Sequence, residues 1–311
     1  MNDTNGLRIL LVGANGQLGH ALSRALLTLG QVRALTREQA DLSDPSLFQN
    51  QLRSACEDFV PTIIVNAAAY TAVDKAESSP DSAMAVNATA VGVMGAWAHE
   101  LGALMVHYST DYVFDGHGTH AWQENDLAHP LSVYGTSKLL GEQALAKVNP
   151  RHLILRTSWV VGTHGGNFLK TMLRLAQERD ALRVVSDQVG VPTSADLLAQ
   201  VTVQLLQAMH EAEGQDPRWG IYHVAASGET TWHAYAQHVI AGAIQRGMVL
   251  KCTPEQVAPI TTEDYPTPAQ RPLNSRLDTD RIVRTFGVRL PPWQAGVDAI
   301  LDQLIQPSTA S

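Results

Sequence analysis

A glycine-rich turn near the N-terminus limits the folds open to this chain more than any other feature. Residues 13–19 read Gly-Ala-Asn-Gly-Gln-Leu-Gly, directly after the apolar segment Arg8–Val12 and at the start of a stretch with helical periodicity, Leu18–Leu29. In a strand–turn–helix unit such glycines permit a tight turn and bring backbone amides at the helix N-terminus close to a phosphate. The spacing has one more residue between the first two glycines than the common dinucleotide-binding pattern. The residues predicted to bind a dinucleotide here are Gly13, Asn15, Gly16, Gln17, Leu18 and Gly19.

Short apolar runs rich in Val, Ile and Leu alternate with helical stretches through the first half of the chain. Strands are predicted at Arg8–Val12, Gln31–Leu35, Thr62–Val65, Leu104–Tyr108 and Leu153–Arg156. Because the runs are mainly apolar and alternate with helices, helices should cover both faces of the sheet. The pattern predicts an α/β fold, a Rossmann-type doubly wound parallel sheet with its ligand crevice beyond the carboxyl ends of the strands.

The length of 311 residues exceeds the usual size of one core, so a smaller C-terminal substrate-binding lobe is expected. We place the Rossmann domain at residues 1–160 and the lobe mainly at 161–311, with some later segments returning to the sheet. The proline-rich stretch Pro254–Pro272 is too apolar for a disordered linker and is predicted to be an ordered loop around a site. Further helices are predicted near Phe168–Arg179 and Ala195–Ala212, and after Thr230 and Thr231.

Composition excludes several classes of partner. The formal net charge is −8 and no block of Lys and Arg occurs, which argues against nucleic acid or an anionic membrane surface. The polar N-terminus lacks the order of a signal peptide and no apolar run is long enough to span a bilayer, so a cytoplasmic location is expected. Cys56 and Cys252 are far apart in sequence, as expected for reduced, unreactive thiols.

Two further segments follow predicted strands. Thr36 and Arg37 come after the second strand, where a carboxylate would bind a ribose diol; a hydroxyl and a cation suit a 2′-phosphate instead. This favours NADPH, with NADH still possible, although Arg37 in a solvated loop is the alternative. Asp41 and Leu42 are predicted to contact the adenine. The small residues of 67–69, which are Ala67, Ala68 and Ala69, would let the backbone approach the cofactor.

Tyr134 and Lys138 lie four residues apart in a helical stretch, so their side chains should share one face of the helix. A nearby ammonium favours the ionised form of a phenol, and we expect Lys138 together with an oxidised nicotinamide to lower the pKa of Tyr134 from its ordinary value of ~10. Thr110 follows the strand Leu104–Tyr108, and its hydroxyl is placed to hydrogen-bond a substrate carbonyl. A turn cap is the alternative for Thr110. Together the three residues indicate a nicotinamide-dependent enzyme.

A short loop contains two histidines and a carboxylate, Asp115, His117 and His120. Histidines in glycine-rich loops are usually solvated, and hydride transfer needs no metal. We therefore expect no metal site.

These motifs resemble the extended short-chain dehydrogenase/reductases, and within them the dTDP-4-dehydrorhamnose reductase family. The resemblance covers almost the whole chain. It rests on Gly13–Gly19, Asn66–Glu77, His107–Phe114, Val133–Lys138, Arg156–Val160, Asp187–Thr193 and Arg271–Ser275.

The resemblance implies NADPH-dependent reduction of the C4 ketone of dTDP-4-dehydro-β-L-rhamnose to dTDP-L-rhamnose, the last step of dTDP-rhamnose synthesis. It implies that Tyr134 donates the proton, that Lys138 holds the nicotinamide ribose, and that Thr110 orients the carbonyl. Residues implied for the sugar nucleotide are Asp111, Trp159, Asn167 and Arg271, with Arg271 as a possible phosphate partner.

Some members carry a glutamate two residues after the third glycine, as part of a magnesium-bridged dimer, whereas this chain has Ala21. A monomer or weak homodimer is therefore expected. Other functions remain open: another nucleotide-4-ketosugar reductase, an epimerase or dehydratase, or a non-catalytic NADP-binding regulatory subunit. Tyr112 follows Asp111, where a dehydratase usually has a glutamate, which counts against a dehydratase.

Overall fold

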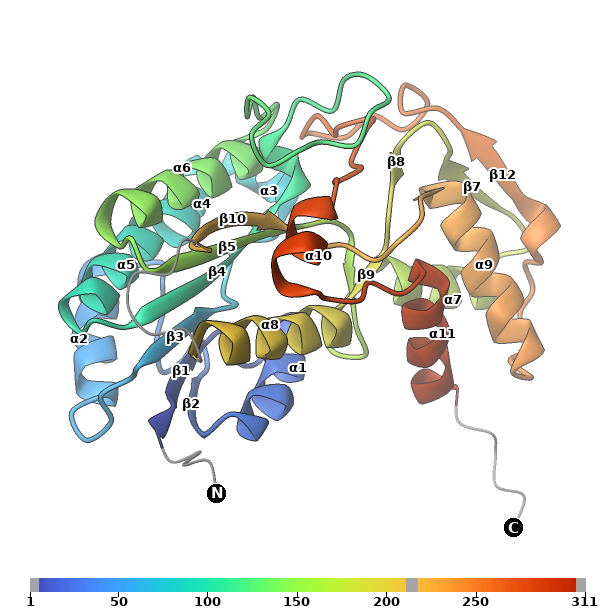
Figure 1. Cartoon of the computed structure of the whole chain (residues 1–311). Coiled ribbons are helices and arrows are strands. Elements are labelled where there is room, and N and C mark those ends of the chain that lie inside the picture. The colour runs from blue at the N-terminus through green and yellow to red at the C-terminus, as the bar shows by residue number, and fades with distance from the viewer. Residues whose placement is uncertain (1–5, 211–217, 306–311) are drawn as a thin grey trace, which may run out of the picture.

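The computed structural model describes residues 6–210 and 218–305, and its centre is a six-stranded parallel sheet (Figure 1). The strand order is β10-β5-β4-β3-β1-β2, and every neighbouring pair is parallel. The strands are β1 Arg8–Val12, β2 Gln31–Leu35, β3 Ile63–Asn66, β4 Leu104–Thr110, β5 His152–Thr157 and β10 Gly220–His223. The predicted Rossmann-type sheet is confirmed.

Helices cover both faces of the sheet because β1 presents apolar side chains in both directions. Ile9 and Leu11 pack in one cluster with α1 and α8, while Leu10 and Val12 pack in the other with α2, α5 and α6. Figure 1 shows these two layers on opposite sides of the strands. The helices are α1 Gln17–Ala25, α2 Pro45–Ala55, α5 Ala90–Glu100, α6 Val133–Val148 and α8 Ala195–His210.

The connections between β3 and β4 and after β4 contain shorter elements. These are α3 Val73–Ser78, α4 Pro80–Met84, the π-helical turn η3 Ala85–Thr89 and the 3-10 turn η4 Asp111–Val113. Asp44 begins α2, because its side chain accepts hydrogen bonds from the Ser46 and Leu47 amides. The first helix differs from its predicted range: α1 ends at Ala25, and the 3-10 turn η2 Leu26–Thr28 completes it.

The second half of the chain passes between the sheet and the remaining elements more than once. Helix α8 packs on α1, β10 pairs with β5, and α10 Asp280–Phe286 lies beside β10 (Figure 1). The elements outside the six-stranded sheet and its covering helices form what we call the lobe. They are α7 Phe168–Glu178, α9 Trp232–Gln245, α11 Trp293–Leu304 and the short strands β6 Val160–Val161, β7 Leu182–Val185, β8 Val189–Gly190, β9 Thr193–Ser194, β11 Thr230–Thr231 and β12 Val257–Ile260. The residues of the predicted helix beyond His210 lie outside the described range.

The proline-rich stretch is not loop throughout. The 3-10 turn η5 Pro254–Gln256 leads into β12, which forms a parallel pair with β7. Pro259 fits in this strand because β12 is an edge strand. It has no second neighbouring strand that would need the backbone N–H that proline lacks. The prediction of an ordered segment holds, but the prediction of a loop is wrong for its first part.

Candidate active site

A cleft lies at the carboxyl ends of β1, β3 and β4, where the order of the strands reverses. It encloses about 690 Å³. Most of the residues predicted to hold the cofactor line it: Gly13, Asn15, Gly16, Gln17, Leu18, Arg37, Asp41, Leu42, Ala67, Ala68, Ala69, Tyr134 and Lys138. Gly19 and Thr36 are not part of its wall.

Two glycines of the turn, Gly13 and Gly19, lie where a side chain would not fit. Gly13 has a φ of +87°, and a Cβ atom on it would lie 2.6 Å from the Ala68 amide nitrogen. A Cβ on Gly19 would lie 2.0 Å from the Gly13 carbonyl oxygen, so this glycine serves the packing of α1 against the turn. Gly16 is the N-cap residue of α1. Because it has no side chain to accept hydrogen bonds, amides of the first turn stay available to a phosphate. The cradle therefore fits a dinucleotide.

At the far end of the cleft, Arg37 and Thr36 have different roles. Arg37 lines the cleft, is 75% exposed and lies 3.7 Å from Asp41 as an ion pair. The Thr36 hydroxyl instead donates a hydrogen bond to Glu38 at 2.7 Å. Only Arg37 of the two is thus placed to meet a ligand in the cleft.

Tyr134 and Lys138 lie in the first two turns of α6, and both line the cleft. Burial raises the pKa of Tyr134 to about 12, and the adjacent Thr110 hydroxyl opposes this rise. Lys138 alone therefore does not bring the pKa of Tyr134 below its ordinary value. The reason is that the loss of solvation outweighs the other influences, whereas sequence spacing reports only which side chains are neighbours.

The Lys138 ammonium is directed into the sheet. It is buried, and Nζ donates a hydrogen bond to the Tyr108 carbonyl oxygen at 2.6 Å. Burial lowers the pKa of Lys138 to about 8, while Glu142, one turn further along α6, raises it. Lys138 consequently changes its charge near neutral pH.

Thr110 acts both as a cap and as a neighbour of the tyrosine. Its Oγ1 accepts a hydrogen bond from the Tyr112 amide at 3.2 Å and donates one to Asp111 Oδ1 at 3.0 Å. Burial raises the pKa of Asp111 to about 6, and its Oδ2 has no hydrogen-bond partner. The turn-cap function and the contact with Tyr134 are thus compatible.

A second cavity, of about 700 Å³, lies between the lobe and α3. Its wall comes from α7, β7, β12 and the segment after β12, and it includes Arg179, Arg183, Gln188, Trp232, Thr267 and Arg271. Asp74 also lines this cavity, whereas the next residue, Lys75, lines the cofactor cleft. The first turn of α3 therefore forms part of both walls, and we call it the junction of the two cavities.

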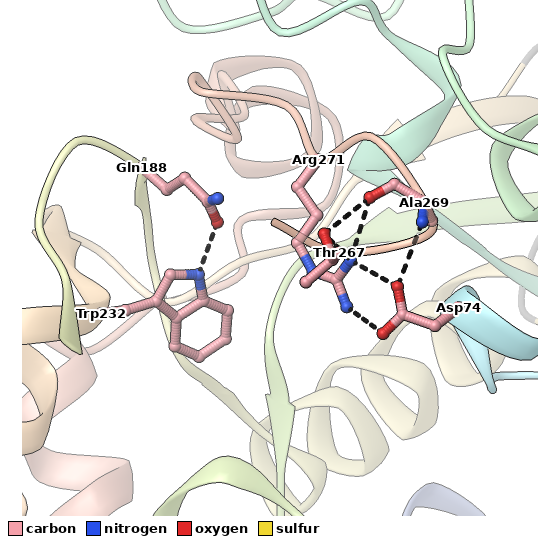
Figure 2. A network of polar contacts seen from close by, with 6 residues as sticks. All are labelled: Asp74, Gln188, Trp232, Thr267, Ala269 and Arg271. Carbon is pink, nitrogen blue, oxygen red and sulfur yellow. Dashed lines mark hydrogen bonds and ion pairs between the residues drawn. The ribbon is translucent and has the colours of Figure 1, made fainter. Parts of the chain in front are cut away.

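Figure 2 shows the polar network at this junction. Arg271 Nη1 and Nη2 donate to the two Asp74 carboxylate oxygens at 2.9 and 2.8 Å, and the Ala269 amide donates to Asp74 Oδ1 at 3.2 Å. Nη1 also reaches the Thr267 hydroxyl at 3.1 Å. A phosphate at Arg271 would therefore share a guanidinium that Asp74 already holds.

Trp159 and Asn167 line neither cavity. Trp159 stacks on Trp232 with ring centroids 3.6 Å apart, and its φ of +44° is unusual for a bulky residue. Asn167 caps α7 by accepting from the Lys170 amide, and its Nδ2 donates to Gln17 Oε1 at 2.9 Å. Both residues support the walls: Trp159 through Trp232, and Asn167 through the glycine turn.

Sequence reasoning did not select Asn87, which lies in the π-helical turn. Its side chain accepts from the Tyr70 amide at 2.8 Å and donates to the Ser137 hydroxyl at 3.0 Å. It thereby ties the segment after β3 to α6, which carries Tyr134. Only the position of this π turn, a feature common at functional sites, marks it.

Two observations concern groups outside the clefts. Within residues 6–210 and 218–305, no three His, Cys, Asp or Glu side chains are grouped to hold a metal ion, and no helix is long and apolar enough to cross a membrane. Cys56 and Cys252 are both buried and unpaired, and burial raises the pKa of Cys56 to about 11.

A doubly wound sheet, a glycine cradle and a Tyr–Lys pair in one cleft define an extended short-chain dehydrogenase/reductase, a nicotinamide-dependent oxidoreductase. A model of the family described as the RmlD substrate binding domain matches residues 7–306. The dTDP-4-dehydrorhamnose reductase of Escherichia coli K12 is 47% identical over 302 residues, which cover 96% of this chain and 98% of that protein. The chain belongs to the dTDP-4-dehydrorhamnose reductase family.

Other comparisons agree. The Burkholderia thailandensis dTDP-4-dehydrorhamnose reductase is 43% identical over 96% of this chain and 99% of its own length. The crystal structure of the Clostridium acetobutylicum protein of that name matches with a TM-score of 0.84 at 35% identity, covering 95% of this chain and 99% of that one. A Bacillus anthracis dTDP-4-dehydrorhamnose reductase in complex with NADP matches with a TM-score of 0.84 at 32% identity, covering 96% and 99%.

Proposed function

We propose that this protein reduces the C4 ketone of dTDP-4-dehydro-β-L-rhamnose to dTDP-L-rhamnose with NADPH, the last step of dTDP-rhamnose synthesis. The observation that carries the proposal is that Tyr134 and Lys138 both line the cofactor cleft and that the Thr110 hydroxyl lies beside Tyr134, with a second cavity nearby. Membership of the dTDP-4-dehydrorhamnose reductase family supports the choice of substrate.

The residues of the cleft divide the chemistry among them. A bound nicotinamide cofactor supplies the hydride to the carbonyl carbon. Tyr134, with a pKa of about 12, is protonated at neutral pH and donates its phenolic proton to the carbonyl oxygen. Thr110 orients that oxygen by a hydrogen bond, with Asp111 as its own acceptor. The Lys138 ammonium, four residues from Tyr134, stabilises the phenolate that remains.

The preference for NADPH is part of the proposal, and Arg37 is the residue that supports it. An exposed guanidinium in the cleft wall suits a 2′-phosphate by charge-assisted hydrogen bonds. We expect Arg37→Ala to raise the Kd for NADPH about tenfold and to leave the Kd for NADH nearly unchanged. Fluorescence titration with both cofactors measures this. Arg24→Ala is the control, since Arg24 is similarly exposed but pairs with Asp196 on α8; an equal loss in both variants contradicts the assignment.

We assign the sugar nucleotide to the second cavity, with Trp232 and Arg271 in its wall. Trp159 and Asn167, which the family resemblance places at the substrate, act here as supports for Trp232 and for the glycine turn. Asp74 keeps Arg271 in place at the junction of the two cavities (Figure 2).

Removal of the Asp74 charge tests this arrangement. We expect Asp74→Asn to raise KM for the nucleotide sugar about tenfold with little change in kcat, because the bidentate pair that orders Arg271 is lost. Glu229→Gln is the matched control, because it breaks the ion pair between Glu229 and Arg276. Arg276 lies close to Arg271 in sequence, and neither Arg276 nor Glu229 lines a cavity. Equal KM values for the two variants would show that the Asp74 pair has no part in substrate binding.

The function is tested by NADPH oxidation with dTDP-4-dehydrorhamnose generated in place, and with a chelator in a parallel reaction. Rapid oxidation that yields dTDP-rhamnose, unaffected by the chelator, supports the proposal. NADPH oxidation with a different 4-ketosugar alone would indicate another ketosugar reductase. Interconversion of sugars without net oxidation would indicate an epimerase, and NADPH binding without turnover would indicate a regulatory subunit. We also propose that the protein is cytoplasmic and that it is a monomer or weak homodimer. Sedimentation of the same sample measures the oligomeric state.

A further inference from the structure

His107 lies on β4 below the cofactor cleft and is completely buried. Its Nε2 atom is 3.3 Å from Lys138 Nζ, and its Nδ1 atom is 3.1 Å from Asn66 Nδ2. Asn66 Oδ1 accepts a hydrogen bond at 3.0 Å from the amide of Ala68, a residue of the cleft wall. A line of polar contacts therefore runs from the cofactor cradle to the lysine.

This line contains more donors than acceptors. A neutral imidazole accepts a hydrogen bond at one nitrogen and donates at the other, whereas an ammonium only donates. If Asn66 donates to Nδ1, then Nε2 carries the proton, and only an uncharged Lys138 amine can accept it. If Lys138 is charged, Nε2 must accept, and Nδ1 then needs an acceptor from Asn66. The charge on Lys138 and the orientation of the Asn66 amide therefore cannot change independently.

We propose that His107 is a positioning residue that accepts a hydrogen bond from the Lys138 ammonium and couples the charge on Lys138 to the Asn66 amide under the cofactor cradle. The inference rests on the proposed function, in which the Lys138 ammonium stabilises the phenolate of Tyr134. It adds a residue that touches neither cofactor nor substrate and acts through Lys138 alone.

The other groups around Lys138 are fixed by their own partners. Tyr108 presents its carbonyl oxygen, while its phenol contacts the Thr202 hydroxyl at 2.6 Å. Glu142, one turn along α6, binds Arg156 of β5 through both carboxylate oxygens. Tyr134, one turn before, is protonated at neutral pH because its pKa is raised.

His107 itself stays neutral over the working range, since burial and the nearby Lys138 charge hold its pKa well below the ordinary value. Of the groups that contact it, Lys138 is therefore the one whose charge varies near pH 8. The tautomer of His107 follows that charge.

The test compares pH profiles of wild type with His107→Leu, His107→Gln and Asn66→Asp. Two quantities are measured for each: the Kd for NADPH by fluorescence, and kcat. In wild type both should worsen above pH about 8, where Lys138 loses its charge. His107→Leu removes an acceptor and should move this limit down by about one pH unit, whereas the Gln side chain supplies an amide oxygen and should leave it near the wild-type value.

Asn66→Asp should move the limit up by about one pH unit. The introduced carboxylate accepts from both Ala68 and His107 Nδ1, which frees Nε2 to accept from the ammonium. A lower pH limit in His107→Leu together with a higher pH limit in Asn66→Asp supports the coupling, because a structural defect would not raise the pH at which Kd and kcat begin to worsen. The proposal is overturned if all four profiles share one limit, or if His107→Gln and His107→Leu shift equally. The NADPH arm needs no turnover, so its result stands even if the sugar substrate is a different one; thermal melting identifies any variant that does not fold.

Discussion

Replacement of Tyr134 by phenylalanine should lower kcat by about 10²-fold or more while the protein still folds and binds NADPH. In the proposed mechanism the phenol, next to Thr110, is the proton donor, and its raised pKa of about 12 keeps the proton on it at neutral pH. Phenylalanine keeps the ring, including its edge-to-face contact with Tyr112 at a centroid distance of 5.6 Å. Steady-state rates at saturating NADPH and ketosugar measure the loss.

The control is the Kd for NADPH, which should stay within about threefold of wild type because the glycine turn and Arg37 are untouched. A rate close to that of wild type would remove Tyr134 from its assigned role. The next candidate would then be Asp111, whose buried carboxyl has a pKa raised to about 6 and contacts Thr110.

Glu142→Ala should reduce the free energy of unfolding by about 3–5 kcal/mol, the largest stability effect we expect. Glu142 and Arg156 form a bidentate pair at 2.9 and 2.6 Å, with side chains only 2% and 4% exposed. The alanine would leave the guanidinium charged and buried over the Phe114 ring without its counter-ion. Denaturant unfolding followed by fluorescence measures the difference.

The matched control is Glu100→Ala, which removes the carboxylate of an exposed pair with Arg53 at 3.3 Å. That pair should contribute less than about 1 kcal/mol, because solvent screens both charges. Equal losses in the two alanine variants would mean that the buried pair contributes no more than a surface pair.

Most of the Rossmann domain is encoded locally. β1 and β2 have their predicted bounds because each is a short strand followed by a turn, and Asp44 with Pro45 marks the start of α2 in sequence and structure alike. β12 was missed because Pro259 argues against a strand, and only the pairing with β7 shows that β12 occupies an edge.

The candidate site divides in the same way. The residues of the glycine turn and the pair Tyr134 and Lys138 are close in sequence, so spacing alone predicts their neighbours. Asp74 and Arg271 are 197 residues apart, and no local pattern indicates that they pair. Asn66, His107 and Lys138 come from three separate elements and meet only when β3, β4 and α6 pack together.

The amino-acid sequence by itself thus determined the alternating order of strands and helices, the glycine-rich turn and the spacing of Tyr134 and Lys138 on one helix, because these depend on periodicity and short-range spacing. Only the tertiary structure decided the pKa values of Tyr134 and Lys138, the partner of Arg271 and the contacts of His107. Desolvation and hydrogen bonding between distant segments set these properties, and both arise only when the chain has folded around the cleft.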